Sequence, residues 1–148
     1  MRIKAEKVYL CCGNKTGVAH PEEWLGIDKE EPCDLKMDVR DIESVKARVV
    51  FATPPCASFT DLPWRRATNK DADILIHCRN LCEQAPLRLL ENNRWAQKII
   101  GTADFHRNSH YFWGNLMVGE FDHYKGATSG HNRSERLKRA AMPPVVFI

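Results

Sequence analysis

A cysteine follows two prolines at the end of a short apolar run, and this is the sharpest chemical signal in the sequence. The run Val49–Ala52 is rich in β-branched and aromatic residues, which is typical of a buried strand, and Pro54 and Pro55 end it. The prolines predict a stiff, extended backbone that carries Cys56 just beyond the strand. A thiolate in that position could act as a covalent nucleophile. The alternative is a structural thiol, which is the commoner role of a single cysteine.

An acidic residue follows the next apolar run. Residues 87–90 predict a further buried strand, and it leads directly into Glu91 and Asn92. A carboxyl group at this point could donate or accept a proton during catalysis. Glu91 could instead cap the next turn or pair with Arg88, so its type alone leaves both roles open.

A glycine and two aspartates follow three earlier apolar segments. Residues 8–12 and 24–27 predict strands, and residues 37–42 predict a weaker one; Gly13, Asp28 and Asp38 lie at or near their ends. In parallel α/β sheets, ligands bind outside the carboxyl ends of the strands. We therefore expect these residues, together with Cys56 and Glu91, to meet at one edge of a sheet.

The elements that would position these residues alternate between strands and helical segments. Residues 43–46 predict a helical turn, residues 71–84 an amphipathic helix, residues 111–113 a strand, and residues 134–141 a short basic helix. This alternation indicates an α/β fold with a mostly parallel sheet. We predict a single domain over residues 1–148, in which residues 116–133 form a short loop region.

Composition narrows the possible partners and compartments. The net charge is +3, from 22 Lys and Arg against 19 Asp and Glu, which permits an acidic partner such as DNA but does not require one.

No apolar run approaches the roughly 18 residues of a membrane span, and the N-terminus lacks a signal-peptide pattern, so we expect a cytoplasmic protein with no membrane partner. The six cysteines then predict reduced thiols. His77, Cys78 and Cys82 lack a second matching pair, so we predict no metal site.

Several motifs resemble those of the DNA cytosine C5 methyltransferases. The segment Pro54-Pro55-Cys56, followed by Ser-Phe-Thr, resembles the Pro-Pro-Cys nucleophile motif of that family. The segment at Glu91-Asn92 is similar to its Glu-Asn-Val motif, and residues 111–116 (Tyr-Phe-Trp-Gly-Asn-Leu) are similar to a string in the eukaryotic de novo enzymes. Residues 10–13 occupy the place of the cofactor loop, and residues 138–144 that of the closing helix. The resemblance spans roughly residues 8–144.

The resemblance implies a minimal Rossmann-like fold of the S-adenosylmethionine-dependent methyltransferase type and methylation of C5 of a flipped-out cytosine in DNA. Cys56 would add to C6 of the base, Glu91 would bond to N3, and Arg107 would supply a cation near O2. The short loop after residue 115 implies a protein partner that supplies target recognition. Contacts with S-adenosylmethionine are expected from Cys12, Gly13, Gly17, Asp28, Asp38, Pro54 and Asn115.

Two other functions remain open from the sequence. One is a catalytically silent, methyltransferase-derived module that binds nucleic acid or a partner enzyme. The other keeps the fold but takes RNA or a free pyrimidine nucleotide as substrate. Residues 111–113 are in either case as compatible with a core strand as with a base-stacking surface.

Overall fold

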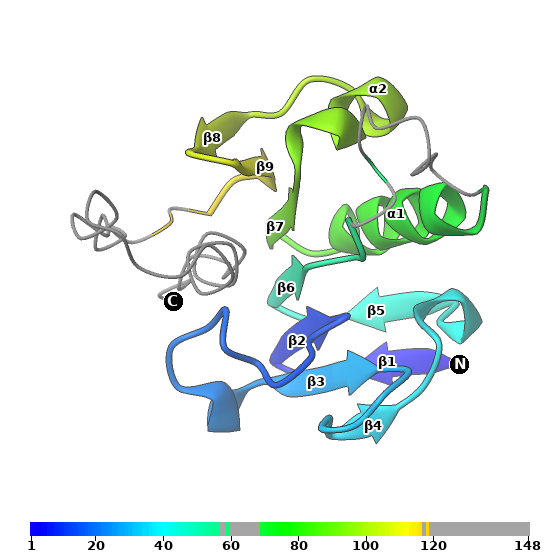
Figure 1. Cartoon of the computed structure of the whole chain (residues 1–148). Coiled ribbons are helices and arrows are strands. Elements are labelled where there is room, and N and C mark those ends of the chain that lie inside the picture. The colour runs from blue at the N-terminus through cyan, green and yellow to red at the C-terminus, as the bar shows by residue number, and fades with distance from the viewer. Residues whose placement is uncertain (57–58, 60–68, 117, 119–148) are drawn as a thin grey trace, which may run out of the picture.

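A seven-stranded sheet with a helix against one face organises the chain (Figure 1). The computed structural model describes residues 1–56, 59, 69–116 and 118. The fold is α/β with a mostly parallel, mixed sheet, as predicted, and is compatible with a Rossmann-like architecture. The strands are β1 (Arg2–Lys4), β2 (Lys7–Leu10), β3 (Leu25–Asp28), β4 (Leu35–Lys36), β5 (Ser44–Lys46), β6 (Val49–Ala52), β7 (Leu87–Asn92), β8 (Phe105–Arg107) and β9 (His110–Gly114). The helices are α1 (Asn69–Cys82) and α2 (Gln97–Ile100), with 3-10 turns at Pro21–Glu23, Val39–Asp41 and Arg94–Ala96.

The strand order places a topological switch at the centre of the sheet. The order is β4-β3-β2-β6-β7-β9-β8, and the first five strands are parallel, whereas β9 runs antiparallel to both of its neighbours. The chain moves outward from β2 to β3 and β4, and then returns to β6 on the other side of β2. In open α/β sheets, such a reversal of strand order opens a crevice at the carboxyl ends of the two central strands. The ends of β2 and β6 therefore define the place to look for a ligand site.

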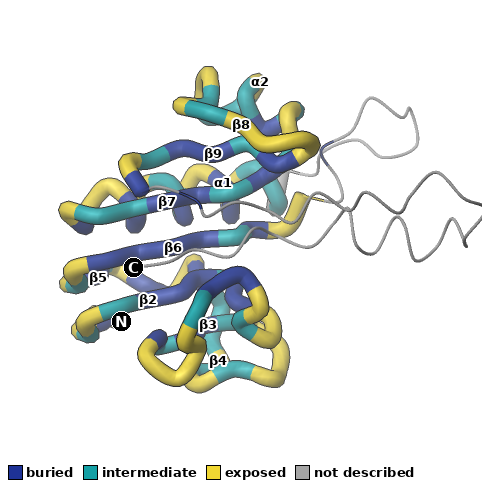
Figure 2. Tube along the Cα trace, turned by 90° about the vertical axis from the view of Figure 1, so that its left-hand side faces the viewer, coloured by how far each residue is buried: buried dark blue, intermediate teal, exposed yellow. Residues whose placement is uncertain are grey.

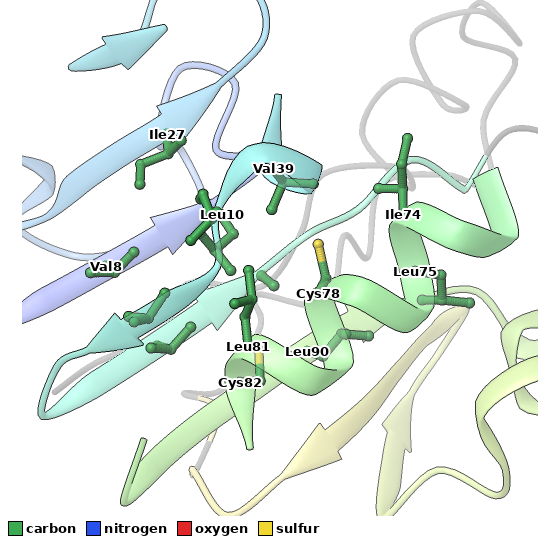
Figure 3. Close-up of a cluster of buried hydrophobic side chains, with 14 of the residues drawn as sticks. Val8, Leu10, Ile27, Val39, Ile74, Leu75, Cys78, Leu81, Cys82 and Leu90 are labelled. Carbon is green, nitrogen blue, oxygen red and sulfur yellow. The ribbon is translucent and has the colours of Figure 1, made fainter. Parts of the chain in front are cut away.

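Helix α1 covers one face of the sheet, and Figure 3 shows its apolar side chains directed toward the strands. The positions with helical spacing in the sequence are all buried, which confirms the predicted apolar stripe: Ile74, Leu75, Cys78, Leu81 and Cys82. They pack in one cluster with Val8, Leu10, Val50 and Leu90 from the central strands. All four residues of β6 are buried, as expected for a strand at the centre of a parallel sheet.

An aromatic cluster forms the opposite face of the sheet. Alternation along the strands directs Tyr9, Phe51 and Phe112 to this side, and each is fully buried. Figure 2 shows the buried, dark blue stretches of β2, β6 and β9. Tyr9 packs against Phe51 with ring centroids 4.7 Å apart, and Phe105 stacks on Phe112 at 4.9 Å. These contacts hold β8 and β9 on the sheet, so the C-terminal hairpin has a defined register.

An ion pair stabilises the connection between β2 and β3, which contains only a 3-10 turn. Lys15 Nζ lies 2.7 Å from Asp34 Oδ2 and also donates to the carbonyl of Trp24. The backbone N–H of Gly26 donates to the same Asp34 oxygen at 2.7 Å. A Cβ on Gly26 would lie 2.8 Å from Lys15 Cδ, so only glycine lets the lysine pack closely over β3. These polar contacts fix the connection between β2 and β3, which contains no α-helix.

Two of the predicted elements are wrong, and three real ones were not predicted. The predicted strand over residues 37–42 is replaced by β4 at residues 35–36 and a 3-10 turn, which Asp38 caps by accepting from the Arg40 N–H. The predicted helical turn at residues 43–46 is strand β5, because pairing with β1 outweighs its local pattern. Strands β1 and β8 and helix α2 are too short to produce a periodic signal. The predicted helix at 134–141, the closing segment at 138–144 and most of the 116–133 loop lie outside the described residues.

Neither helix in the described part of the chain combines the length and apolarity needed to cross a bilayer.

Gly114 offers a test of the hairpin register. Its φ is +144°, and a Cβ at this position would lie 2.2 Å from the carbonyl oxygen of Arg88 in the next strand. We expect Gly114→Ala to lower the free energy of unfolding by about 3 kcal/mol, because it adds a backbone clash to conformational strain. Gly101→Ala is the matched control, since Gly101 has a φ of +89° but open space at its Cβ; strain alone costs it about 1–2 kcal/mol. Equal losses for the two variants, measured by urea unfolding, would contradict this register.

Candidate active site

A cavity of about 190 Å³ opens at the switch point of the sheet. The ends of β2, β3 and β6 line it, together with the 3-10 turn after β4 and the side of α1. Four apolar side chains form much of its wall: Ile27, Met37, Val39 and Ile74. Gly13, Asp28 and Asp38 supply its polar edge, so three residues predicted to contact a cofactor are brought together here. An apolar wall with acidic groups at one rim suits a ligand that has a flat ring and hydroxyl groups.

Asp28 ties the turn after β2 to the end of β3. Its Oδ2 accepts a hydrogen bond from the Gly13 N–H at 2.9 Å, and its Oδ1 accepts one from the Glu30 N–H at 3.1 Å. Gly13 has a φ of +49°, which is a left-handed conformation that glycine adopts without strain. The carboxylate therefore shapes the backbone at the mouth of the cavity and also faces it.

Asp38 also lines the cavity, but Arg40 engages its carboxylate. The Arg40 guanidinium donates to both oxygens of Asp38, at 3.0 and 2.5 Å, and the Arg40 N–H donates to Oδ1. A charge-neutralised, bidentate carboxylate retains acceptor capacity but is less able to bind a second cation. Asp38 is accordingly better suited to accept a bond from a neutral amino group than from a charged one.

Two asparagines at the end of β7 hold the loop that carries Cys56. The buried Asn92 side chain donates to the Pro54 carbonyl at 3.1 Å. The Asn93 side chain donates to the carbonyls of Cys56 and Phe59, at 3.1 and 2.7 Å. These bonds join the ends of β6 and β7, which the chain separates by helix α1. Cys56 is exposed at the surface but has a restrained backbone.

Cys56 and Glu91 interact electrostatically. Burial of the sulfur by surrounding atoms raises the pKa of the Cys56 thiol, and the nearby Glu91 carboxylate raises it further. The Tyr9 hydroxyl is part of the same polar group, because burial and then Glu91 raise its pKa while a hydrogen bond with Thr53 lowers it. Two of the three residues predicted to be catalytic, Cys56 and Glu91, thus lie near enough to interact electrostatically, and the raised pKa keeps the Cys56 thiol neutral at neutral pH.

Glu91 bonds to a histidine that the sequence interpretation did not assign to the site. His110 Nδ1 lies 2.8 Å from Glu91 Oε1, and both side chains are largely buried, with 11% and 14% of their surfaces exposed. Arg107 pairs directly with His110 in the β8–β9 register, so it lies one strand farther from Glu91. Its side chain makes no hydrogen bond or ion pair with the described residues, and it is exposed. Arg107, predicted as a cation near O2 of the base, thus lies on β8, which β9 separates from β7.

Four of the predicted cofactor residues lie away from the cavity. Cys12 is buried in the aromatic cluster on the other face of the sheet, because the left-handed φ of Cys11 breaks the alternation at the end of β2. Gly17 is buried in the loop that Lys15 closes, and Pro54 is buried with its carbonyl bound to Asn92. Asn115 bonds to the N–H of Arg88 and the carbonyl of Pro86, at the amino end of β7 and hence the opposite edge of the sheet.

The sequence interpretation missed several residues of this region. Cys11 and Thr53 line the cavity in place of their neighbours Cys12 and Pro54, and Pro55 lines it as well. Strict alternation along β2 would have assigned Cys12 to this face, but the left-handed φ of +53° at Cys11 breaks the alternation and places Cys11 there instead. No local signal marked His110, since its contact with Glu91 depends on the pairing of β7 with β9.

The six cysteine thiols are all free. The sulfur atoms of Cys11 and Cys78 lie 3.9 Å apart between the end of β2 and α1. Within the described residues, no group of three or more His, Cys, Asp or Glu side chains is arranged to hold a metal ion.

Neither the known family models nor the curated proteins include a match to this chain.

Proposed function

We propose that this chain is an S-adenosylmethionine-dependent methyltransferase that methylates C5 of cytosine in DNA through a covalent bond to Cys56. The observation that carries the proposal is the meeting of Cys56 and Glu91 at the ends of two adjacent parallel strands, β6 and β7. Asn92 and Asn93 hold the loop that carries Cys56, and Pro55, the residue before Cys56, lines the cavity at the switch point. A minimal methyltransferase fold of the Rossmann type accounts for this order of strands around a cofactor crevice.

The chemistry requires a nucleophile and a proton donor on the same base. Cytosine C5 is too weak a nucleophile to take a methyl group directly, so the Cys56 thiolate adds to C6 and makes C5 electron-rich. The Sγ–C6 bond forms as the C5–C6 π electrons shift to the C4–C5 bond and those of the C4–N3 double bond move to N3, which accepts a proton from Glu91. After methyl transfer, solvent takes the proton from C5, the C5–C6 double bond forms again, and the Sγ–C6 bond breaks with its electron pair on sulfur. N3 gives its proton back, which restores the aromatic base and the free thiolate.

The cavity residues fit the cofactor that this reaction requires. When bound, S-adenosylmethionine supplies an electrophilic methyl group whose bonding electrons remain on the departing thioether. Asp28 would accept from the ribose hydroxyls, Asp38 from the adenine amino group, and the exposed Gly13 backbone would adjoin the methionine portion. Ile27, Val39 and Ile74 would pack against the adenine ring.

Two cationic side chains lie over an aromatic ring just after the end of β7, and this cluster supports a nucleic-acid substrate. Arg94 and Lys98 both lie over the Trp95 ring, at 4.3 and 4.7 Å from its centroid, and Arg94 directly follows Asn93 in the chain. Cations and aromatic faces together suit phosphates and unstacked bases. With a net charge of only +3, a protein partner could supply most of the target recognition.

The decisive experiment is covalent trapping on DNA that contains 5-fluorocytosine, in the presence of S-adenosylmethionine. Fluorine at C5 blocks the final elimination, so the base should remain bonded to the protein on a denaturing gel. We expect mass spectrometry of the adduct to place the modification on Cys56. DNA binding without any adduct, in every sequence context tested, would instead support a silent binding module. An adduct with RNA or a free nucleotide alone would change the substrate class.

Asp28 provides a test of the cofactor site. A ligand at a hundredfold excess over its Kd stabilises a protein by about 2.7 kcal/mol, so S-adenosylmethionine should raise the melting temperature of the wild type. We expect Asp28→Asn to lose most of this rise, because an amide oxygen is a weaker acceptor for the ribose hydroxyls. Asp41→Asn, which removes an exposed carboxylate outside the cavity lining, is the control. An undiminished rise in Asp28→Asn would place the cofactor elsewhere.

A further inference from the structure

The strongest unassigned feature is the contact between Glu91 and His110, and its interpretation rests on the function proposed above. Strand register brings the two residues together: Glu91 pairs with Phe112 across β7 and β9, and His110 is two residues from Phe112 on the same face. The His110 Nδ1 to Glu91 Oε1 distance of 2.8 Å is that of a charge-assisted hydrogen bond. A residue that supports Glu91 from this position acts on the base only through that carboxyl group.

We infer that His110 is a positioning residue that holds the Glu91 carboxyl group and stores the proton that Glu91 delivers to N3 of the base. At pH values where a lone carboxyl group is fully ionised, an imidazolium–carboxylate pair still holds one transferable proton. When the Cys56 thiolate bonds to C6, the single proton of the pair passes from His110 Nδ1 through Glu91 to N3, which leaves a neutral imidazole and an ionised Glu91. When the Sγ–C6 bond breaks, the proton on N3 returns to the pair.

Among the described residues, three adjoining strands contribute charged and titratable groups near this pair. From β2, the Tyr9 hydroxyl is in electrostatic contact with Glu91. The end of β6 contributes Cys56, and β8 contributes Arg107, which lies opposite His110 in the register. The tyrosine and the cysteine both stay neutral near pH 7, since the pKa of each is raised. Among these groups, the imidazole is therefore the one whose ordinary titration range includes neutral pH.

The test compares two substitutions of His110 over a range of pH. His110→Asn keeps a side-chain N–H donor near the Nδ1 position but cannot titrate, and His110→Phe removes the donor while filling the space. His106→Asn is the matched control, because His106 is on the same hairpin but stacks on Tyr111 on the other face of the sheet. The readouts are the rate of adduct formation on 5-fluorocytosine DNA and the NMR titration of the His110 ring in the ligand-free protein.

In the wild type, we expect the adduct rate to rise with pH as the thiolate fraction grows, and then to level off as the pair loses its proton. The pH of that break should match the midpoint of the His110 titration. His110→Asn should be about 10–100-fold slower near neutral pH, with no such break, and His110→Phe should be at least as slow. Glu91→Gln should move the His110 midpoint to lower pH, because the imidazolium loses its carboxylate partner.

The outcomes separate this inference from the proposed function. A wild-type adduct whose rate and pH profile are unchanged in His110→Asn would refute the proton store and leave the methyltransferase function standing. A His110 midpoint that does not move in Glu91→Gln would refute the shared proton in the same way. If the wild type forms no adduct, the proposed reaction fails, and the catalytic use of the pair fails with it even where the NMR titration shows coupling.

Discussion

Cys56→Ala should abolish the covalent adduct and lower methyl transfer to DNA by at least about 10⁴-fold, the scale on which the loss of a catalytic nucleophile acts. This is the largest effect that we expect from a single substitution. None of the other five thiols is placed like Cys56, since Cys12, Cys78 and Cys82 are buried, Cys11 lies within the cavity wall, and Cys33 packs against the aromatic cluster. The measurement is single-turnover transfer of a labelled methyl group from S-adenosylmethionine to DNA.

The fold should tolerate this change, because the alanine keeps the backbone carbonyl that Asn93 bonds. Cys33→Ala is the matched control: Cys33 is half-buried, and its substitution should leave the rate within about twofold of wild type, as for most residues remote from a reaction. Cys56→Ala should also bind DNA with wild-type affinity. Residual methyl transfer at a tenth of the wild-type rate would mean that Cys56 is not the nucleophile.

Glu91→Gln should slow the addition of Cys56 to the base but speed the alkylation of Cys56 by a small reagent. Adduct formation should slow by about 10²–10³-fold, because the amide cannot give N3 a proton. In the ligand-free protein, however, alkylation of Cys56 by iodoacetamide should become faster. Burial and then the Glu91 carboxylate raise the pKa of this thiol, so removal of the negative charge lowers the pKa and increases the thiolate fraction at neutral pH.

The opposite signs distinguish a catalytic carboxyl group from a structural one. A purely structural Glu91 would disturb the loop when it is substituted, and both rates would fall together. Glu83→Gln is the control, because it neutralises a carboxylate at the end of α1, where Glu83 pairs with Arg79 and Arg88. Mass spectrometry at limiting iodoacetamide reports the fraction alkylated at Cys56 itself. Slower alkylation in Glu91→Gln than in wild type would contradict the electrostatic coupling of the two residues.

The main strands and the principal helix were predictable because each has a strong periodic or apolar pattern. The buried run of β6, the run of β7 and the helical spacing from Ile74 to Cys82 all correspond to elements of the structure. The shorter elements were not predictable: β5 resembles a polar turn, and only its pairing with β1 makes it a strand. The absence of a helix between β2 and β3 follows from a polar contact, Lys15 with Asp34, whose partners are 19 residues apart.

The candidate site was predictable to the extent that it depends on strand ends. Gly13, Asp28 and Asp38 meet at one cavity because parallel strands present their carboxyl ends at the same edge. Position along the chain could not determine which face a side chain takes after a strand ends. Cys12 and Pro54 are buried for this reason, while Cys11 and Thr53 line the cavity.

By itself, the sequence determined which reactive groups follow the strands. A thiol follows a strand end stiffened by prolines, a carboxyl group follows the next strand, and acids follow two others. These depend on residue types and on contacts between near neighbours, which the order of residues specifies. The partner of Glu91 was decided only when the chain folded, since an antiparallel strand inserted beside β7 brings His110 there and leaves Arg107 one strand away. Strand pairing at long sequence separation is set by the packing of the whole sheet, and no local pattern encodes it.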